Sequence, residues 1–305
     1  MDKTSSKEQS VTHRSVMVDE VLEYLQPQAG GLYLDATFGG GGHTRAILEH
    51  EPGCRVVAID WDTVSLEKFA DPLVEEFGDR FSYIWGSFAH LYKLLKKAKI
   101  QKVDGVLADF GTSQMQIGTR PGFSIYRDAP LDMRMSPPHQ RVTAQEIVNS
   151  APEYELVKIF TDFGEERYAR RIAHAIVESR SKRPLVTTGE LADLVERVAP
   201  APRGPRRIHP ATRVFQSLRI VVNKEIDNIH AFLPAAFDAL KIGGRMVCIS
   251  FHSLEDREVK TFFRQQGLES VGQVITKKVV TPSTDEIAAN PRSRSAKLRC
   301  LQRLV

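Results

Sequence analysis

The chain has 305 residues, of which 42% are hydrophobic and 26% are charged, a globular balance that excludes a mostly disordered or fibrous protein. Lys and Arg exceed Asp and Glu by 42 to 38, so the net charge of +4 is mildly basic and names no partner by itself. Three scattered cysteines make no disulfide framework, and no apolar run is long enough for a signal peptide or a membrane span. These features favour a cytoplasmic protein without a membrane partner.

The first third of the chain alternates between short apolar runs, typical of buried strands, and amphipathic helical patterns. The predicted strands cover residues 32–37, 55–60, 81–85 and 103–109, and the predicted helices cover residues 44–50, 63–77 and 88–98. Strands that alternate with helices of this length predict a parallel sheet with crossover helices.

The alternation stops after the fourth predicted strand and resumes only after residue 210. Residues 118–141 are rich in Gly, Pro and Met and are expected to be irregular. Helices are then predicted over residues 157–163, 166–180 and 188–198. Beyond them come a helical stretch over 214–239 interrupted near Pro234, a strand over 245–251, a helix over 254–265, and strands over 271–277 and 297–304.

Seven predicted strands with one long interruption indicate an α/β domain that is split in the sequence. We expect a flexible tail over residues 1–10 and a sheet domain made of residues 11–117 and 214–305. Residues 118–213 would form an inserted helical domain that recognises the substrate.

A glycine-rich loop follows the first predicted strand, which ends in Asp35. Gly39 to Gly42 are four consecutive glycines, as needed where the backbone takes positive φ or approaches a ligand closely. Asp60 ends the second strand, where an acid commonly accepts hydrogen bonds from ribose hydroxyls. A dinucleotide-binding loop has the pattern G-x-G-x-x-G, whereas Thr44 stands here in place of the third glycine. The acid before the loop, Asp35, also suits the cationic S-adenosylmethionine better than a pyrophosphate. The pattern favours a methyl donor over a dinucleotide, and a tight turn without a ligand is the third interpretation.

A third acid, Asp109, ends the fourth predicted strand. In a doubly wound sheet this strand neighbours the first, so Asp109 should face the same crevice. A helix cap or turn is the alternative role for such an acid. No cluster of Cys and His has metal-ligand spacing, so no metal site is expected.

Several sequence blocks resemble the bacterial small-subunit ribosomal RNA methyltransferase H family, also called MraW. The most specific blocks are HPATR at 209–213 and SFHSLED at 250–256, and the match runs from about residue 11 to the C-terminus. The other matching blocks are HRSVMVDE at 13–20, DATFGGGGH at 35–43, AID at 58–60, GFS at 122–124, GEER at 164–167 and NPRSRS at 290–295.

The resemblance implies a Rossmann-like class I S-adenosylmethionine-dependent methyltransferase with a seven-stranded sheet and an inserted helical domain. It implies methylation of the exocyclic N4 of a cytosine in the decoding region (P site) of 16S rRNA, within the small ribosomal subunit. Carried over motif by motif, the residues that contact S-adenosylmethionine would be Gly41, Gly42, His43, Asp60, Phe88, Asp109 and Gln116. The chain departs from the family where Asp109-Phe-Gly-Thr-Ser-Gln114 follows the fourth strand and where Pro121 follows Arg120.

The chemistry of the implied reaction points to Asp109 as the catalytic residue. The lone pair of cytosine N4 is delocalised into the ring, so the enzyme must align N4 and accept hydrogen bonds from its amino hydrogens. The polar-Pro-Pro-aromatic motif that other amino-methyltransferases use for this is absent, and Asp109 or a nearby carbonyl is expected to replace it. The extruded base would stack on aromatic residues and meet polar ones, for which the candidates are Phe123, Phe215, Phe251, His252 and Ser253.

Two runs of basic residues without acids indicate an RNA-binding face. The first extends over residues 197–224 and the second over residues 287–305. Clustered cations bind phosphates in a salt-dependent way, although a solvated basic surface is the plain alternative. The RNA contacts are assigned to Arg206, Arg207, Arg213, Arg292 and Arg294.

Two other functions compete with the rRNA methyltransferase. One is a methyltransferase that acts on another nucleic acid or a small molecule, and the other is a noncatalytic RNA-binding assembly factor with the same fold. The sequence does not determine the oligomeric state, and a homodimer is one of the states that it allows.

Overall fold

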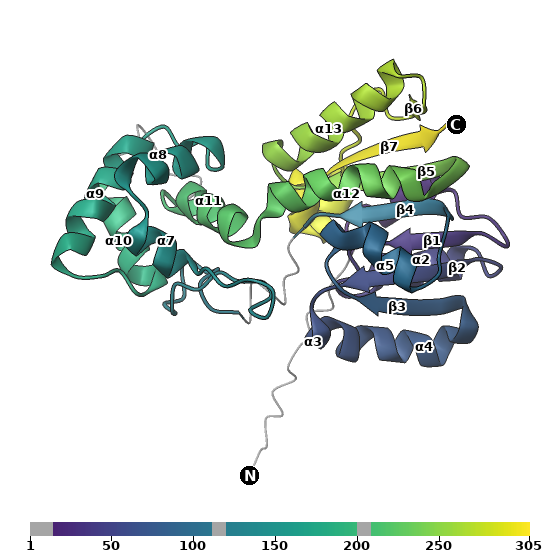
Figure 1. Ribbon diagram of the computed structural model, residues 1–305, viewed down its shortest axis with the longest axis horizontal. Coiled ribbons are helices and arrows are strands. Elements are labelled where there is room, and N and C mark those ends of the chain that lie inside the picture. Colours follow the sequence, from purple (N-terminus) through teal and green to yellow (C-terminus); the bar gives the residue numbers. More distant parts are fainter. Residues whose placement is uncertain (1–14, 112–119, 200–208) are drawn as a thin grey trace, which may run out of the picture.

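The structure is a computed structural model that describes residues 15–111, 120–199 and 209–305. Its centre is a seven-stranded sheet in the order β3-β2-β1-β4-β5-β7-β6 (Figure 1). The strands are β1 (Leu32–Asp35), β2 (Arg55–Asp60), β3 (Phe81–Trp85), β4 (Val103–Asp109), β5 (Leu240–Ser250), β6 (Gly272–Val274) and β7 (Lys297–Arg303).

The strand directions identify the fold. Pairing is parallel from β3 through β5, whereas β7 pairs antiparallel with β5 and with β6. This order with one reversed strand is that of class I S-adenosylmethionine-dependent methyltransferases, so the predicted fold class is confirmed. Strand order reverses between β1 and β4, and the carboxyl ends beside such a switch point are where open α/β sheets bind ligands.

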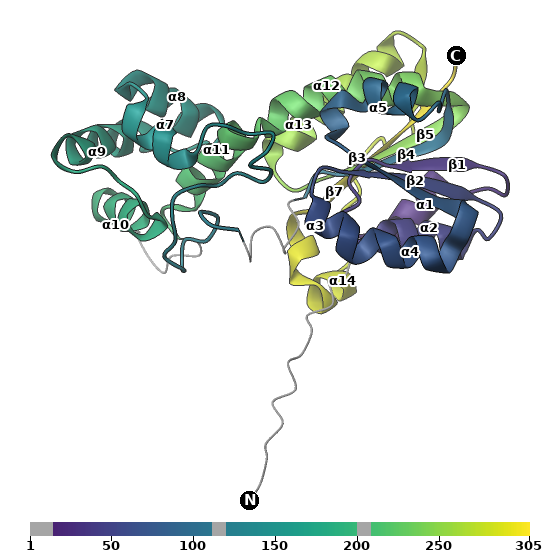
Figure 2. The same ribbon diagram turned by 60° about the horizontal axis from the view of Figure 1, so that its bottom comes forward.

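Helices cover both faces of the sheet (Figure 2). One face carries α5 (Leu91–Lys97), α12 (Glu225–Ala239) and α13 (Ser253–Leu268), which share a core with β4. The other face carries α1 (Val18–Leu25), α2 (Gly42–His50) and the segment from α3 (Thr63–Ser65) through the π-helix η1 (Leu66–Ala70) to α4 (Asp71–Phe77). Short helical turns complete this domain: η2 (Gly78–Arg80), η3 (Phe88–His90), α14 (Thr284–Ala289) and η4 (Pro291–Ser295).

The helices that follow β4 form a second body beside the sheet (Figure 1). They are α7 (Ala144–Ser150), α8 (Glu153–Asp162), α9 (Ala169–Lys182), α10 (Thr188–Val198) and α11 (Thr212–Asn223). Capping boxes start α7 at Thr143 and α10 at Thr187, as expected for Thr three residues before Glu. Their apolar faces enclose a core that includes Phe160, Ile176 and Leu218. The sequence-based domain limits stay a prediction, and this core places α11 with the inserted helices.

Most predicted elements are present, and several differ in detail. The helical stretch 214–239 is broken at Lys224, not near Pro234 as predicted, because Lys224 takes a left-handed conformation (φ 52°) while α12 continues through Pro234. The predicted strand over 271–277 is shortened to β6, and β5 begins at Leu240 and not at the predicted residue 245. Among the described helices, three were not predicted, namely α1, α7 and α14. Residues 120–141 are irregular, as predicted.

Among the described residues, the structure contains no helix with the length and apolar character needed to cross a membrane.

Candidate active site

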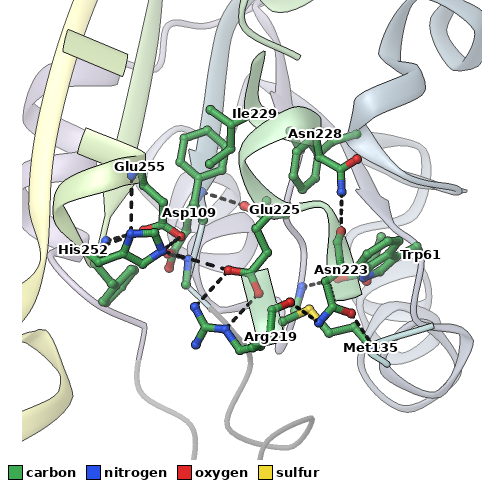
Figure 3. Close-up of a pocket in the computed structure, with 18 of the residues that line it drawn as sticks. Trp61, Asp109, Met135, Arg219, Asn223, Glu225, Asn228, Ile229, His252 and Glu255 are labelled. Carbon is green, nitrogen blue, oxygen red and sulfur yellow. Dashed lines mark hydrogen bonds and ion pairs between the residues drawn. The ribbon is translucent and has the colours of Figure 1, made fainter. Parts of the chain in front are cut away.

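A cavity of about 540 Å³ opens at the carboxyl ends of the central strands and continues beneath the inserted helices. Its walls come from both parts of the chain. The half formed by the sheet includes Gly39, His43, Asp60, Trp61, Phe88 and Asp109. The half formed by the inserted segment and the α11–α12 bend includes Phe123, Met133, Phe215, Arg219 and Glu225, and His252 at the N-cap of α13 also lines the cavity. Figure 3 shows residues of both halves around the same space.

The glycine loop forms one edge of this cavity. Gly39 takes a positive φ of 53° and donates its N–H to Asp60 Oδ2 at 2.8 Å, which fixes the loop to the end of β2. Gly41 and Gly42 do not line the cavity, since they pack behind the loop against other side chains. A Cβ on Gly42 would lie 2.2 Å from Ser15 Oγ. Gly41 and Gly42 were predicted to contact the cofactor, and the structure places them where they determine the shape of the loop.

Gly41 offers a test of how tightly the loop is packed. Its φ is 75°, and a Cβ there would lie 2.8 Å from the ring of Phe38. Gly41→Ala is expected to destabilise the protein by about 2–4 kcal/mol, because both strain and overlap oppose the methyl group. Gly30 has nearly the same φ of 77° with no atom within 4 Å of its Cβ, so Gly30→Ala should cost only about 1 kcal/mol. Thermal denaturation of both variants measures the difference, and equal losses would contradict the packing argument.

Asp35 supports the loop from beneath and is not itself a cavity residue. Its Oδ2 accepts a hydrogen bond from Thr44 Oγ1 at 2.7 Å, and its Oδ1 accepts one from Thr37 N at 3.1 Å. The side chain is buried, and burial raises the pKa of this carboxyl. Asp35 therefore ties the end of β1 to the first turn of α2.

Asp60 presents a partly buried carboxylate at the end of β2. Besides the N–H of Gly39, it accepts the N–H of Asp62 at 2.9 Å on Oδ1. Burial outweighs these two hydrogen bonds and raises the pKa of Asp60 from 3.8 to about 6. Each oxygen keeps one further lone pair, which suits a ligand that donates two neighbouring hydroxyl hydrogens.

Asp109 and His43 face one another at the switch point between β1 and β4. His43 Nε2 lies 2.8 Å from the carbonyl oxygen of Val16, which only accepts, so Nε2 carries the proton and Nδ1 points toward Asp109. Nδ1 is 4.0 Å from Asp109 Oδ2. The other oxygen, Oδ1, accepts the N–H of Gly111 at 3.0 Å, and Oδ2 makes no hydrogen bond among the described residues.

The position of Asp109 also changes its acidity. Burial is the main cause that raises its pKa, to about 6, and the neighbouring His43 opposes that shift. About a fifth of its side chain remains accessible, at 20%. A carboxyl with an open oxygen and a pKa close to neutrality can accept a hydrogen bond or a proton from a group in the cavity.

Aromatic side chains line the sheet half of the cavity. Phe88 packs against Phe110 and Phe232 at ring-centroid distances of 5.9 and 5.4 Å. Trp61 stacks against His139 of the inserted segment, with 6.5 Å between the ring centroids and 26° between the ring planes. Trp61 was not a predicted site residue, although its position directly after the strand-end Asp60 was the signal that could have identified it.

The inserted half contains polar residues that the sequence-based prediction missed as site residues. Asn223 uses its whole amide group, because Oδ1 accepts from Met135 N and Gln140 Nε2 while Nδ2 donates to the carbonyls of Met133 and Arg219. The irregular segment is thereby fixed to α11. Arg219 and Glu225 form a bidentate pair across the bend at Lys224.

The predicted base-stacking residues Phe123, Phe215 and Phe251 all line the cavity, as does His252. Ser253 instead contacts Glu165 Oε1 at 3.3 Å and is not a cavity residue. These placements agree with a shared site, while the roles of the residues stay predictions.

Of the predicted RNA-binding arginines that the structure describes, Arg292 lines the cavity, whereas Arg213 and Arg294 do not. Arg292 is exposed and lies at the cavity lining, Arg294 is exposed nearby on η4, and Arg213 donates to the carbonyl oxygen of Glu165 at 3.0 Å. Gln116, Arg206 and Arg207 lie outside the described residues. Of the two basic runs, Arg219 and Arg299 are held in internal ion pairs, with Glu225 and with Asp256.

Glu225, His252 and Glu255 bring three possible metal ligands within 4.8 Å of one another. The cap of α13 gives another role to two of them, since His252 Nδ1 accepts the N–H of Glu255 at 3.4 Å and Glu255 Oε2 accepts the N–H of Phe251 at 2.7 Å. An accepting Nδ1 places the proton of a neutral imidazole on Nε2, the atom that would have to bind the metal. We read the group as a helix cap beside an ion pair, and metal analysis of the purified protein should find far less than one bound ion per chain. A stoichiometric ion that is lost in His252→Asn would contradict this.

Comparison with known proteins now identifies the family. Residues 10–304 match the MraW methylase family. The chain belongs to that family. Proteins called ribosomal RNA small subunit methyltransferase H are its relatives: one from Rhodopseudomonas palustris is 46% identical and aligns over 98% of this chain and 92% of that protein. One from Syntrophotalea carbinolica is 47% identical over 96% and 98% of the two chains.

Membership of the MraW methylase family makes the cavity a candidate methyl-transfer site. A third relative with the same name, from Coprothermobacter proteolyticus, is 48% identical over 96% of each chain. These matches cover both the sheet and the inserted helices, so the family relationship includes both halves of the cavity.

Proposed function

We propose that the chain transfers a methyl group from S-adenosylmethionine to the exocyclic N4 of a cytosine in the decoding region (P site) of 16S rRNA. The observation that carries this proposal is the open Oδ2 of Asp109 at the switch point, between a half suited to the methyl donor and an aromatic half suited to a base. The names of relatives that share 46–47% of their residues with this chain support rRNA as the substrate class.

The sheet half fits S-adenosylmethionine. Asp60 would accept hydrogen bonds from the two ribose hydroxyls, and Trp61 and Phe88 would flank the adenine. The carboxylates of Asp60 and Asp109 favour a ligand with positive charge. S-adenosylmethionine supplies the electrophilic methyl group when it is bound.

The chain's own residues would align the nucleophile. A cytosine that has left its stack can enter between the aromatic side chains of Phe215 and Phe251. Asp109 Oδ2 then accepts a hydrogen bond from N4, which localises the nitrogen lone pair and holds it in line with the methyl group. After transfer the N4 proton passes to this carboxylate or to water.

The substrate would approach across the basic residues of η4 and α11. Arg292 and Arg294 are exposed on η4, and Arg213 is on α11. Together with Arg206 and Arg207 we propose them as phosphate contacts, whose binding should weaken with salt. A cytoplasmic location and a homodimer are further predictions, which fractionation and light scattering can test.

Nucleoside analysis tests the proposed function. Small-subunit rRNA from cells that lack this protein should have lost N4-methylated cytosine, and purified protein with labelled S-adenosylmethionine should restore it on isolated small subunits. Unchanged nucleosides, with methylation of DNA or another RNA instead, would favour a different nucleic acid substrate. Absence of S-adenosylmethionine binding in calorimetry would favour a noncatalytic RNA-binding assembly factor.

A further inference from the structure

Arg219 and Glu225 form a largely buried ion pair in the wall of the cavity (Figure 3). Arg219 is on α11, and Glu225 is the first residue of α12. The left-handed conformation of Lys224 turns the chain between them, so that Arg219 Nε lies 2.8 Å from Glu225 Oε1 and Nη2 lies 2.9 Å from Oε2.

Burial makes this pair an unusual feature of the fold. Only 20% of the Arg219 side chain and 11% of the Glu225 side chain are exposed. Buried ion pairs contribute little net stability, because the loss of hydration offsets their attraction. A pair of this kind in a cavity wall is better explained by ligand recognition than by stability.

The geometry leaves one edge of the guanidinium available. Glu225 accepts the single N–H of Nε and one of the two N–H groups of Nη2. A guanidinium has five N–H donors in one plane, so both N–H groups of Nη1 and the second N–H of Nη2 remain. No hydrogen bond joins them to another described residue, and Arg219 lines the cavity. The free edge carries two parallel donors, a fork that fits two adjacent coplanar acceptors.

We propose, resting on the function proposed above, that Arg219 recognises the target cytosine through the N3 and O2 acceptors of its ring. Glu225 is a positioning residue that holds the guanidinium plane. Uracil carries an N–H at N3 and would oppose one donor of the fork, and adenine offers one acceptor on the corresponding edge. The same fork therefore selects cytosine while Asp109 engages N4.

The helix that carries Arg219 also supplies a stacking surface. Phe215 precedes Arg219 by four residues, one turn along the same face of α11, and both line the cavity. A base that packs on the ring of Phe215 would present its edge to the guanidinium. The nearby His252 and Glu255 are engaged in the cap of α13, whereas one edge of the Arg219 guanidinium is open.

The decisive experiment combines a protein variant with an atomic change in the substrate. Arg219→Lys keeps the positive charge beside Glu225 and removes the fork. With small subunits and labelled S-adenosylmethionine, we expect kcat/KM to fall about tenfold to a hundredfold, with unchanged cofactor affinity in calorimetry. Subunits reconstituted with 3-deazacytidine at the target position lack the N3 acceptor.

On the two substrates the variants should differ in a defined way. The wild type should have a higher kcat/KM for subunits with cytidine than for subunits with 3-deazacytidine. The ratio of these two kcat/KM values should fall by about tenfold in Arg219→Lys, because the variant has no fork to bind the N3 acceptor. Glu225→Gln should lower the ratio by a smaller factor. Arg183→Lys is the matched control, since Arg183 pairs with Glu190 on the surface of the inserted domain and should keep the wild-type ratio.

A folding defect can be separated from lost recognition. Arg219→Met combined with Glu225→Met removes both charges together and should melt within a few degrees of the wild type, yet show the reduced ratio. An unchanged ratio in Arg219→Lys, or a loss of cofactor affinity, would overturn the proposal and assign Arg219 to a phosphate or to the cofactor. If wild-type protein methylates no cytosine N4 at all, the proposed function itself fails.

Discussion

Asp109→Asn is expected to lower kcat for methyl transfer by about a hundredfold to ten-thousandfold. The variant keeps the size of the side chain and the hydrogen bond from Gly111 to Oδ1, but it replaces the open Oδ2 with an NH₂ group. An amide hydrogen there would oppose the amino hydrogen of cytosine N4. Single-turnover assays with small subunits and labelled S-adenosylmethionine measure the step directly, and cofactor affinity should change only a fewfold.

The control for Asp109→Asn is Asp79→Asn, which removes an exposed carboxyl in the same domain. It should leave turnover and cofactor affinity unchanged. Full turnover in both variants would remove Asp109 from the mechanism and transfer the role to a backbone carbonyl.

Asp109→Asn should also stabilise the protein in the absence of ligands. The pKa of Asp109 is raised from 3.8 to about 6, so the folded state binds more protons than the unfolded state between these values. The contribution of the Asp109 carboxyl to the stability of the folded state is therefore complete below pH 3.8 and is lost as the pH rises through about 6. Because a fifth of the side chain faces the cavity, we expect Asp109→Asn to gain only about 1–2 kcal/mol at neutral pH, or a few degrees in Tm. Equal melting temperatures at neutral pH would contradict the raised pKa.

The sequence could predict the sheet half of the site because its information is local. Asp60 and Asp109 each end an apolar run, and parallel strands bring their carboxyl ends to one edge. Once alternating strands and helices are assigned, the shared crevice follows without any knowledge of long-range contacts. The fold class was predictable for the same reason.

The inserted half was not predictable in this way, because it depends on contacts between distant segments. Arg219 belongs to a basic run that indicates an RNA surface, and its burial depends on the turn at Lys224. Lysine gives no signal for a left-handed residue, whereas Pro234 gives a false signal for a helix break. Asn223 likewise contacts Met133 and Met135, far away in the sequence. Such pairings follow from tertiary packing and have no local pattern.

Asp60→Asn is expected to weaken S-adenosylmethionine binding by about thirtyfold to a hundredfold in calorimetry. The carboxylate already accepts the backbone N–H groups of Gly39 and Asp62, and two ribose hydroxyls would complete its four lone-pair positions. Hydrogen bonds to a charged acceptor contribute about 1.5–3 kcal/mol each, and an amide loses the charge and one acceptor. Asp79→Asn again provides the control.

The pH dependence distinguishes this role from a merely structural one. Burial raises the pKa of Asp60 to about 6, and a cationic ligand binds its ionised form more tightly, so binding releases protons near that pH. Wild-type affinity should therefore rise with pH through about 6 and level off above it. In Asp60→Asn this rise should be smaller, with only Asp35 and Asp109 left to contribute. A variant with weak affinity but an unchanged pH profile would mean that Asp60 only holds the glycine loop, since the loss would then come from Gly39 and not from the carboxylate charge.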